Sequence, residues 1–162
     1  MSLALKIVAF ANGGEIPSRY TCSGADISPA LAWSGVSPAA RSLALIVDDP
    51  DAPRGTWTHW LVWNLPPYTT MLPERVPPRE VLDNGARQGR NDFDRIGYGG
   101  PCPPAGKTHR YFFRLLVLDA MLDLQAAARR KEVDRAMKGH ILAEVQWMGL
   151  YGNHNGGSGR PR

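Results

Sequence analysis

Prolines and glycines interrupt this sequence so often that they limit the kind of fold it can adopt. The 162 residues include 14 prolines and 17 glycines, and the apolar runs between them are short. Because both residue types end regular structure, their spacing favours strands and loops over a helical bundle. The length suits a single domain that buries its own core. We therefore expect one domain over residues 1–152, followed by a flexible polar tail at residues 153–162.

Hydrophobic patterns predict several strands and one helix. Residues 42–47 form a continuous apolar run, which is typical of a strand that is buried on both faces. The only good helix candidate covers residues 126–138, with Gly139 placed as its C-terminal cap. Strands do not alternate with helices along the chain, so the pattern predicts a mainly β fold, an antiparallel β-sandwich with one or two short helices. The predicted strands cover residues 3–10, 30–33, 42–47, 59–65, 109–118 and 141–148.

Charge and hydropathy restrict the classes of partner. The formal net charge is +4 and the isoelectric point is near 9.3, which favours anionic ligands in general. Basic residues are scattered and form no Lys/Arg-rich arm, so we expect no nucleic-acid binding. No apolar segment approaches the roughly 18 residues of a membrane span. The sequence does not decide between contact and no contact with a membrane surface. With no visible export signal, we expect a cytoplasmic location with Cys22 and Cys102 as reduced thiols.

Two of the four histidines stand at the start of predicted strands, next to unusual loops. His59 follows the proline-stiffened acidic loop of residues 48–53, and His109 follows the Gly/Pro-rich loop of residues 97–104. Together the loops could present two imidazoles, the carboxylate of Asp49 and free backbone amides to one small polar ligand. Imidazoles donate hydrogen bonds to phosphate, and a carboxylate behind one fixes its orientation. Taken singly, each histidine could instead be a structural residue satisfied by local backbone.

Other sites built on the same region fit the sequence less well. Residues 101–108 (PCPPAGKT) resemble a P-loop, but a proline replaces the first glycine, and prolines lack the N–H groups that cradle phosphate. A metal site of Asp49, His59 and His109 is arithmetically possible but has no diagnostic short spacing. A serine hydrolase would need a G-x-S-x-G elbow, which the chain lacks. We expect no metal and no cofactor.

Short motifs along most of the chain resemble those of the phosphatidylethanolamine-binding family. They are DPDAP at residues 49–53 with His59-Trp60, HRY at residues 109–111, and AMKGHIL at residues 136–142. The sequence is most similar to the prokaryotic, Raf-kinase-inhibitor-like branch. The resemblance implies a β-sandwich-like fold with an anion pocket at one end. Its pocket residues correspond to Asp49, His59 and His109, with Pro53 and Trp57 as walls, Gly100 and Pro101 as backbone lining, and Tyr111 as a nearby aromatic.

These observations predict a non-catalytic binding protein for a phosphate-like anion. The anion would belong to a phospholipid headgroup, a nucleotide or a phosphorylated group on a partner. The family resemblance also implies a protein partner, either a kinase or a protease, and a homodimer. The alternative is a hydrolase of a small phospho- or acyl-ester, in which Asp49 and His59 activate water against a substrate held by His109.

Overall fold

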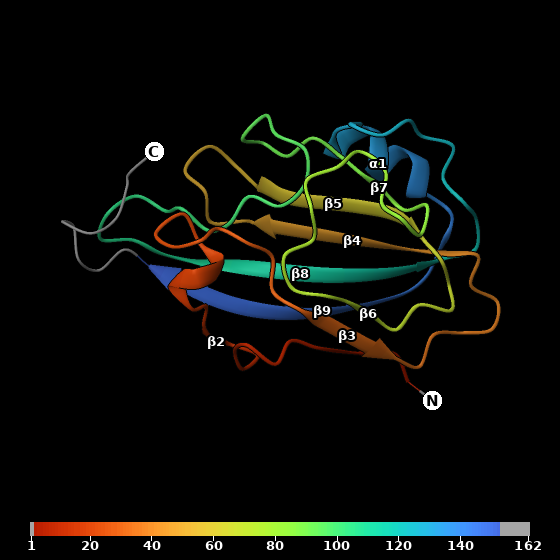
Figure 1. Cartoon of the computed structure of the whole chain (residues 1–162), viewed down its shortest axis with the longest axis horizontal. Helices are drawn as coiled ribbons and strands as arrows, with labels where there is room; N and C mark the ends of the chain where they lie inside the picture. The colour runs from red at the N-terminus through yellow and green to blue at the C-terminus, as the bar shows by residue number, and fades with distance from the viewer. Residues whose placement is uncertain (1, 153–162) are drawn as a thin grey trace.

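Two β-sheets form the framework of the computed structural model, which describes residues 2–152 (Figure 1). The smaller sheet has the strand order β1-β3-β6 and the larger one β2-β9-β8-β4-β5-β7. All strand pairs are antiparallel except the short β2–β9 pair. The prediction of a mainly β, predominantly antiparallel architecture is confirmed. The strands are β1 (Ala4–Lys6), β2 (Gly14–Glu15), β3 (Leu31–Ser34), β4 (Ser42–Asp49), β5 (Trp57–Leu65), β6 (Met71–Leu72), β7 (Arg87–Gln88), β8 (Thr108–Leu118) and β9 (Ile141–Gly152).

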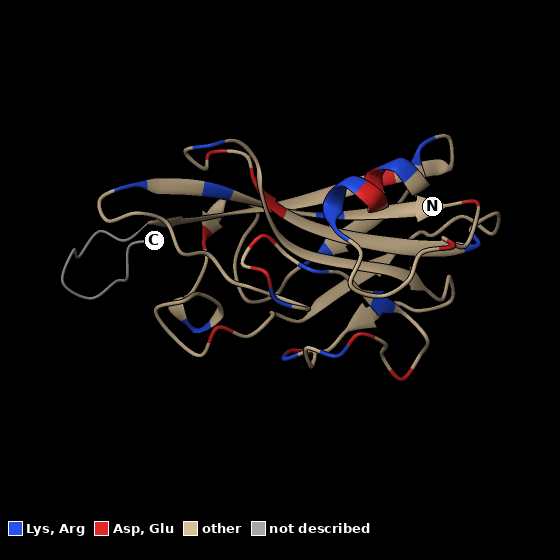
Figure 2. Ribbon diagram, turned by 90° about the horizontal axis from the view of Figure 1, so that it is seen from above, with Lys and Arg blue, Asp and Glu red and all other residues tan. Residues whose placement is uncertain are grey.

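The larger sheet is buried on both faces at its centre. Alternate residues of β4 face opposite sides because side chains along a strand alternate. Leu43, Leu45 and Val47 join the core between the two sheets, whereas Ala44 and Ile46 join a second core with the helix α1 (Arg130–Met137). Figure 2 shows α1 on one side of the long strands of the larger sheet. All eight residues of β4 are buried, which confirms the prediction for residues 42–47.

Local patterns located the long strands well and the short ones poorly. The strand predicted over residues 3–10 is confined to β1. The long connecting stretch of residues 68–100, where no strand was predicted, contains the two-residue strands β6 and β7. Strands of two residues are too short to show an alternating pattern. A 3₁₀-helix, η1 (Ser18–Tyr20), was not predicted either. The predicted tail at residues 153–162 lies outside the described residues.

The helix is shorter than its sequence pattern suggested. Ala127 has a φ of 73°, which a right-handed helix does not allow, so α1 begins only at Arg130. At its start the Glu132 carboxylate accepts a hydrogen bond from the Arg129 backbone N–H at 2.9 Å. Gly139 follows the helix with a φ of 84°, which confirms its role in ending it. No helix among residues 2–152 is long and apolar enough to cross a membrane.

Cys22 and Cys102 form a disulfide, so the expectation of reduced thiols was wrong. Their Cα atoms lie 5.4 Å apart although 80 residues separate them in sequence. The contact arises because the segment after η1 packs along the Gly/Pro-rich loop, where the Cys22 N–H donates to the Pro101 carbonyl at 3.0 Å. The expectation rested on the absence of an export signal, which carries no information on how closely the fold brings two thiols together.

Candidate functional site

A β-bulge in β5 aims His59 into the space between the sheets. In the β4–β5 ladder Val47 pairs with Trp60 and Asp48 pairs with Thr58, so His59 has no opposite residue in β4. Strict alternation would place His59 on the same face as Leu61, beneath α1. The extra residue instead turns the His59 ring toward Tyr111, with the ring centroids 5.3 Å apart. Bulges commonly re-aim side chains beside functional sites.

Asp49 and His109 meet at the end of the sheet where β4 ends and β8 begins. The His109 Nδ1 atom lies 2.7 Å from the Asp49 Oδ2 atom, and Asp49 is only 1% exposed. A second hydrogen bond comes from the Asp51 backbone N–H to Asp49 Oδ1 at 2.8 Å. Burial raises the pKa of the Asp49 carboxyl, while the hydrogen bonds from His109 and Asp51 oppose that rise. The carboxylate fixes the His109 ring and leaves its Nε2 atom as the remaining polar atom.

A cavity of about 370 Å³ opens in front of this pair. Three of the predicted site residues line it: Pro53, Trp57 and His109. Sequence reasoning missed the other lining residues, which are Ala52, Arg54 and Pro104. Arg54 follows the DPDAP motif directly, so its position beside Pro53 was the available signal. The cavity thus combines apolar walls with one imidazole and one exposed guanidinium.

The other predicted site residues form a buried layer behind the cavity walls. The Tyr111 ring stacks on His109 with centroids 6.3 Å apart, and His59 meets the Tyr111 ring edge-on. Phe93 completes this layer by packing at 5.3 Å from His59 and 5.5 Å from Trp57. Phe93 lies in the long connecting stretch, where nothing in the sequence marked it.

The Gly/Pro-rich loop reaches the site through its backbone. The Gly99 carbonyl accepts a hydrogen bond from His59 Nδ1 at 2.6 Å, and the Gly99 N–H donates to the His59 carbonyl at 2.9 Å. A carbonyl oxygen can only accept, so His59 carries its proton on Nδ1. Gly100 and Pro101 are buried in the same loop. Gly100 and Pro101 follow the Gly99 that binds His59, and they are not among the residues that line the cavity.

Asp51 extends the polar end of the site toward β8. Both of its carboxylate oxygens bind the Arg110 guanidinium, at 2.8 and 2.9 Å, and Oδ2 also accepts from the Arg110 backbone N–H. These hydrogen bonds, with the charge of Arg110, lower the pKa of Asp51 to about 2. Asp51 is therefore a fixed negative charge that ties the acidic loop to the start of β8.

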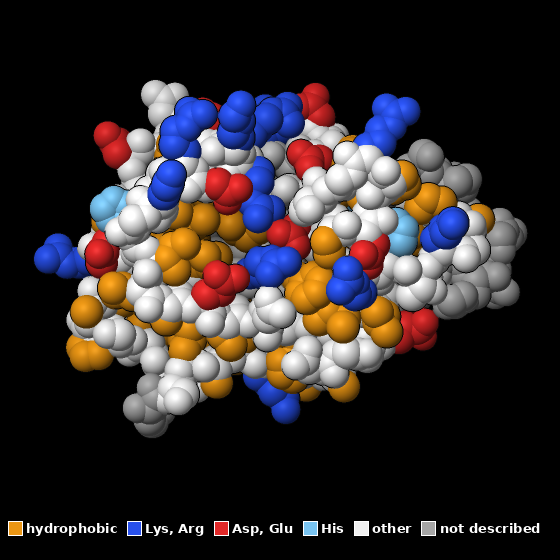
Figure 3. All heavy atoms as spheres, turned by 180° about the vertical axis from the view of Figure 1, so that it is seen from behind, with side chains coloured by type: hydrophobic (Ala, Val, Ile, Leu, Met, Phe, Trp, Pro, Cys, Tyr) orange, Lys and Arg blue, Asp and Glu red, His pale blue; other side chains and the backbone are white. Residues whose placement is uncertain are grey.

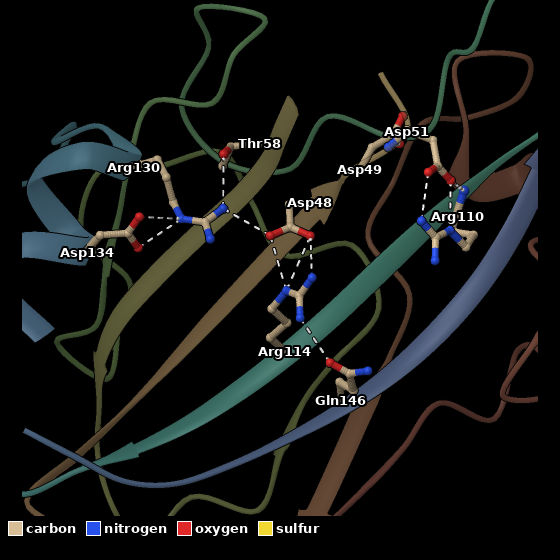
Figure 4. A network of polar contacts seen from close by, with 9 residues as sticks. All are labelled: Asp48, Asp49, Asp51, Thr58, Arg110, Arg114, Arg130, Asp134 and Gln146. Atoms are coloured by element: carbon tan, nitrogen blue, oxygen red, sulfur yellow. Dashed lines mark hydrogen bonds and ion pairs between the residues drawn. The ribbon is translucent and has the colours of Figure 1, made fainter. Parts of the chain in front are cut away.

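The outer face of the larger sheet carries a second, larger hollow of about 730 Å³ (Figure 3). Apolar side chains such as Ile46 and Met137 form part of its surface, and ion-paired side chains also line it. Figure 4 shows Asp48, 2% exposed, between the guanidinium groups of Arg114 and Arg130. Because these groups satisfy one another and join α1 to the sheet, we interpret the network as structural.

A metal ion has no evident place in this part of the chain. Among residues 2–152, no group of three or more histidine, cysteine, aspartate or glutamate side chains is arranged to hold one.

Curated proteins of archaea are similar to this chain over nearly its whole length. A UPF0098 protein of Methanothermobacter thermautotrophicus is 55% identical over 147 residues, which cover 91% of this chain and 97% of the relative. The UPF0098 protein PH1269 of Pyrococcus horikoshii is 49% identical over 154 residues, covering 93% of this chain and 77% of the relative.

Solved structures show the same fold. A putative phosphatidylethanolamine-binding protein homologue from Chlamydia trachomatis superimposes with a TM-score of 0.84 at 40% identity, covering 93% of this chain and 97% of the other. YBCL of E. coli, described as a new member of the mammalian PEBP family, gives a TM-score of 0.87 at 32% identity, covering 94% and 99%. The family model described as phosphatidylethanolamine-binding protein matches residues 6–152. The chain therefore belongs to the phosphatidylethanolamine-binding protein family.

Proposed function

We propose that the chain is a non-catalytic binding protein that holds a phosphate-like anion in the cavity in front of Asp49 and His109. The observation that carries the proposal is the buried hydrogen bond between Asp49 and His109, of which His109 lines the cavity. A carboxylate behind an imidazole favours the protonated ring, which then donates its second hydrogen bond outward. The outward atom is His109 Nε2, because Nδ1 is held by Asp49 and His109 lines the cavity.

The other residues that line the cavity fit a ligand in which a small anionic group is attached to an apolar or short polar group. Arg54 is an exposed cation at the cavity wall, and Trp57 and Pro53 offer apolar contact beside it. Small-molecule sites commonly combine such apolar walls with a few placed polar groups. The phosphate of a phospholipid headgroup, of a nucleotide or of a phosphorylated side chain has the same recognition chemistry. Phosphatidylethanolamine, in the name of the family, is one carrier of that group.

The state of Cys102 supports binding without chemistry. Cys102 was the one potential nucleophile in the Gly/Pro-rich loop, and in the disulfide it has no thiolate to attack a substrate. The hydrolase alternative would then depend on water activated by the Asp/His groups alone. Turnover of phenyl phosphate or phenyl acetate that disappears in Asp49→Ala would favour that alternative.

Calorimetric titration with inorganic phosphate and with phosphorylethanolamine tests the proposal. We expect saturable binding to the wild-type protein and loss of at least tenfold in affinity for His109→Ala, because the main donor is removed. His140→Ala is the matched control, since His140 forms a similar 2.8 Å contact with Asp119 but is exposed and lies outside the cavity lining. Equal affinity in all three proteins would contradict the proposal.

A second variant tests the aromatic layer behind His109. Tyr111 is buried against His109, and its replacement by Phe keeps the ring that packs there. Because Tyr111 does not line the cavity, Tyr111→Phe should bind phosphate as tightly as the wild type. The kinase or protease partner, the homodimer and the cytoplasmic location stay predictions.

A further inference from the structure

Two segments that are far apart in sequence are joined at four points directly behind the site. We call residues 20–26 the anchor segment and residues 98–102 the pocket loop. The links are the Cys22–Cys102 disulfide, a hydrogen bond from Cys22 N–H to the Pro101 carbonyl at 3.0 Å, one from the Tyr98 hydroxyl to the Tyr20 carbonyl at 2.7 Å, and one from Gly100 N–H to Asp26 Oδ1 at 2.7 Å.

Two of the links are hydrogen bonds made by the side chains of Tyr98 and Asp26. Desolvation raises the pKa of the Tyr98 hydroxyl well above its usual value, so the hydroxyl keeps its proton and donates. Asp26 has a φ of 59°, a left-handed conformation that aspartate, asparagine and glycine tolerate better than other residues. This backbone conformation accompanies the hydrogen bond between the Asp26 carboxylate and the pocket loop.

The packing between the segments leaves no room for a side chain at Gly100. A Cβ atom there would lie 2.6 Å from Asp26 Oδ1, 2.9 Å from Thr21 Cα and closer still to the Tyr20 carbonyl oxygen. The two backbones therefore touch directly, which makes the position of the pocket loop depend on the anchor segment.

The pocket loop in turn sets the state of His59. Gly99 exchanges two hydrogen bonds with His59, one to the ring and one to the backbone. The ring bond fixes both the orientation of the imidazole and the nitrogen that carries the proton. His59 packs on Tyr111, which packs on His109 at the cavity wall. A shift of the loop would thus pass through two ring contacts to the anion site.

We propose that the anchor segment is a positioning element for the anion site, and that the affinity of the site therefore depends on the redox state of the disulfide. This inference rests on the proposed function, because it concerns the regulation of the same site. Asp26 is its positioning residue, since it acts on the ligand only through the pocket loop. Loops held in their bound conformation bind more tightly because less ordering is left for the ligand to impose.

The redox step uses a dithiol reductant. Cys22 is partly exposed whereas Cys102 is buried, so an external thiolate has access to the Cys22 sulfur. Attack there breaks the protein S–S bond and forms a mixed disulfide. The second thiol of the reductant then displaces Cys22. Two electrons and two protons pass to the protein, which gains two thiols, and the reductant becomes a cyclic disulfide.

The test compares the phosphate affinity of the full chain before and after reduction with dithiothreitol. We expect about a tenfold loss on reduction, because the loop loses its covalent link and keeps only hydrogen bonds. Near-UV circular dichroism at the same temperature checks that the reduced protein is folded. The variant with both Cys22→Ala and Cys102→Ala is the control, and its affinity should be low and insensitive to the reductant.

Variants at Asp26 test positioning with the disulfide intact. Asp26→Gly keeps the backbone conformation but removes the acceptor for Gly100 N–H, and we expect phosphate affinity to fall about fivefold. Asp26→Asn keeps an Oδ1 acceptor and should restore most of the affinity. ¹⁵N NMR of the His59 ring gives a readout independent of ligand. The proton on Nδ1 should become less localised in Asp26→Gly and in the reduced protein.

The outcomes separate this inference from the proposed function. Equal phosphate affinity in the oxidised, reduced and Asp26→Gly proteins, with an unchanged His59 spectrum, would overturn the positioning role and leave the anion site standing. An oxidised wild-type protein that binds neither inorganic phosphate nor phosphorylethanolamine would overturn the proposed function and this inference with it. If the reduced protein is unfolded, the oxidised Asp26→Gly protein decides the question.

Discussion

The Nδ1 atom of His109 lies 2.7 Å from the Oδ2 atom of Asp49; both side chains are buried, and His109 lines a cavity. This arrangement gives one histidine a fixed orientation and a single outward-facing nitrogen. A second aspartate–histidine pair, Asp119 with His140, has nearly the same geometry at 2.8 Å but is exposed. The chain therefore contains its own control for the effect of burial and of position at the cavity.

Replacement of the buried carboxylate should weaken anion binding. Asp49→Asn removes the negative charge that holds the His109 ring by its Nδ1 atom, and we expect the affinity for phosphate to fall about tenfold. Asp119→Asn changes the exposed pair in the same way and should leave the affinity unchanged. Calorimetry at neutral pH checks both variants, and a similar loss in Asp119→Asn would show that the effect is not local to the cavity.

Arg54 should contribute a long-range attraction for the anion. Arg54→Gln removes the cation at the cavity wall, and we expect a loss of affinity of a few-fold that diminishes as salt is added, because exposed charges are screened. Arg79→Gln is the control, since Arg79 pairs with Asp83 on the surface and lies outside the cavity lining. Titrations at low and high sodium chloride measure the effect. If Arg54→Gln binds phosphate as tightly as the wild type at low salt, Arg54 makes no such contribution.

Gly100 should tolerate no side chain. Gly100→Ala forces the pocket loop away from the anchor segment, and we expect a loss of about 2 kcal/mol in the free energy of unfolding together with weaker phosphate binding. Gly106→Ala meets no atom within 4 Å, so its cost should be only about 1 kcal/mol, from the positive φ of 82°. Urea denaturation compares the two, and equal losses would mean that packing at Gly100 is loose.

The ion pairs beneath α1 should stabilise the fold. Arg130→Met leaves the buried Asp48 carboxylate with Arg114 alone, and we expect a loss of about 2 kcal/mol in the free energy of unfolding. Arg79→Met removes another arginine that pairs with an aspartate four residues later, but both partners are exposed, so its cost should stay within about 0.5 kcal/mol. Similar losses in the two variants would contradict the structural role of the network.

Protonation of Asp51 in acid should make the folded protein less stable. Its pKa is lowered to about 2 in the folded protein, mainly by hydrogen bonds from Arg110. A lowered carboxyl pKa contributes stability above its ordinary value near 3.8, and that contribution is lost as the pH falls through about 2. The contribution should be below about 1 kcal/mol because the Arg110 side chain is half exposed.

Urea denaturation between pH 5 and pH 2 checks this dependence. Asp51→Asn should be less stable than the wild type at pH 5, and the difference should shrink toward pH 2. The raised pKa of Asp49 acts in the opposite direction, since its burial costs stability as the pH rises. The charge of Asp51 is the smallest of the causes that set the pKa of Asp49, so most of that contribution is common to both proteins. A constant difference across the range would show that Asp51 is not titrating as described.

The sequence by itself determined the long strands, the family and the candidate site residues that stand at the strand ends. Residues 42–47 are apolar on both faces because β4 lies between two cores, and this appears directly as an unbroken apolar run. His59 and His109 stand near the beginnings of β5 and β8, and the DPDAP motif at residues 49–53 follows β4. These features are local, so neighbouring residues are enough to reveal them.

Only the tertiary structure decided how these residues meet. The bulge that aims His59 inward depends on the register between β4 and β5, which no pattern within β5 encodes. Phe93 joins the site from the long connecting stretch, and the Cys22–Cys102 disulfide joins segments 80 residues apart. Each of these contacts is made between distant parts of the chain, where packing and not local propensity sets the distance.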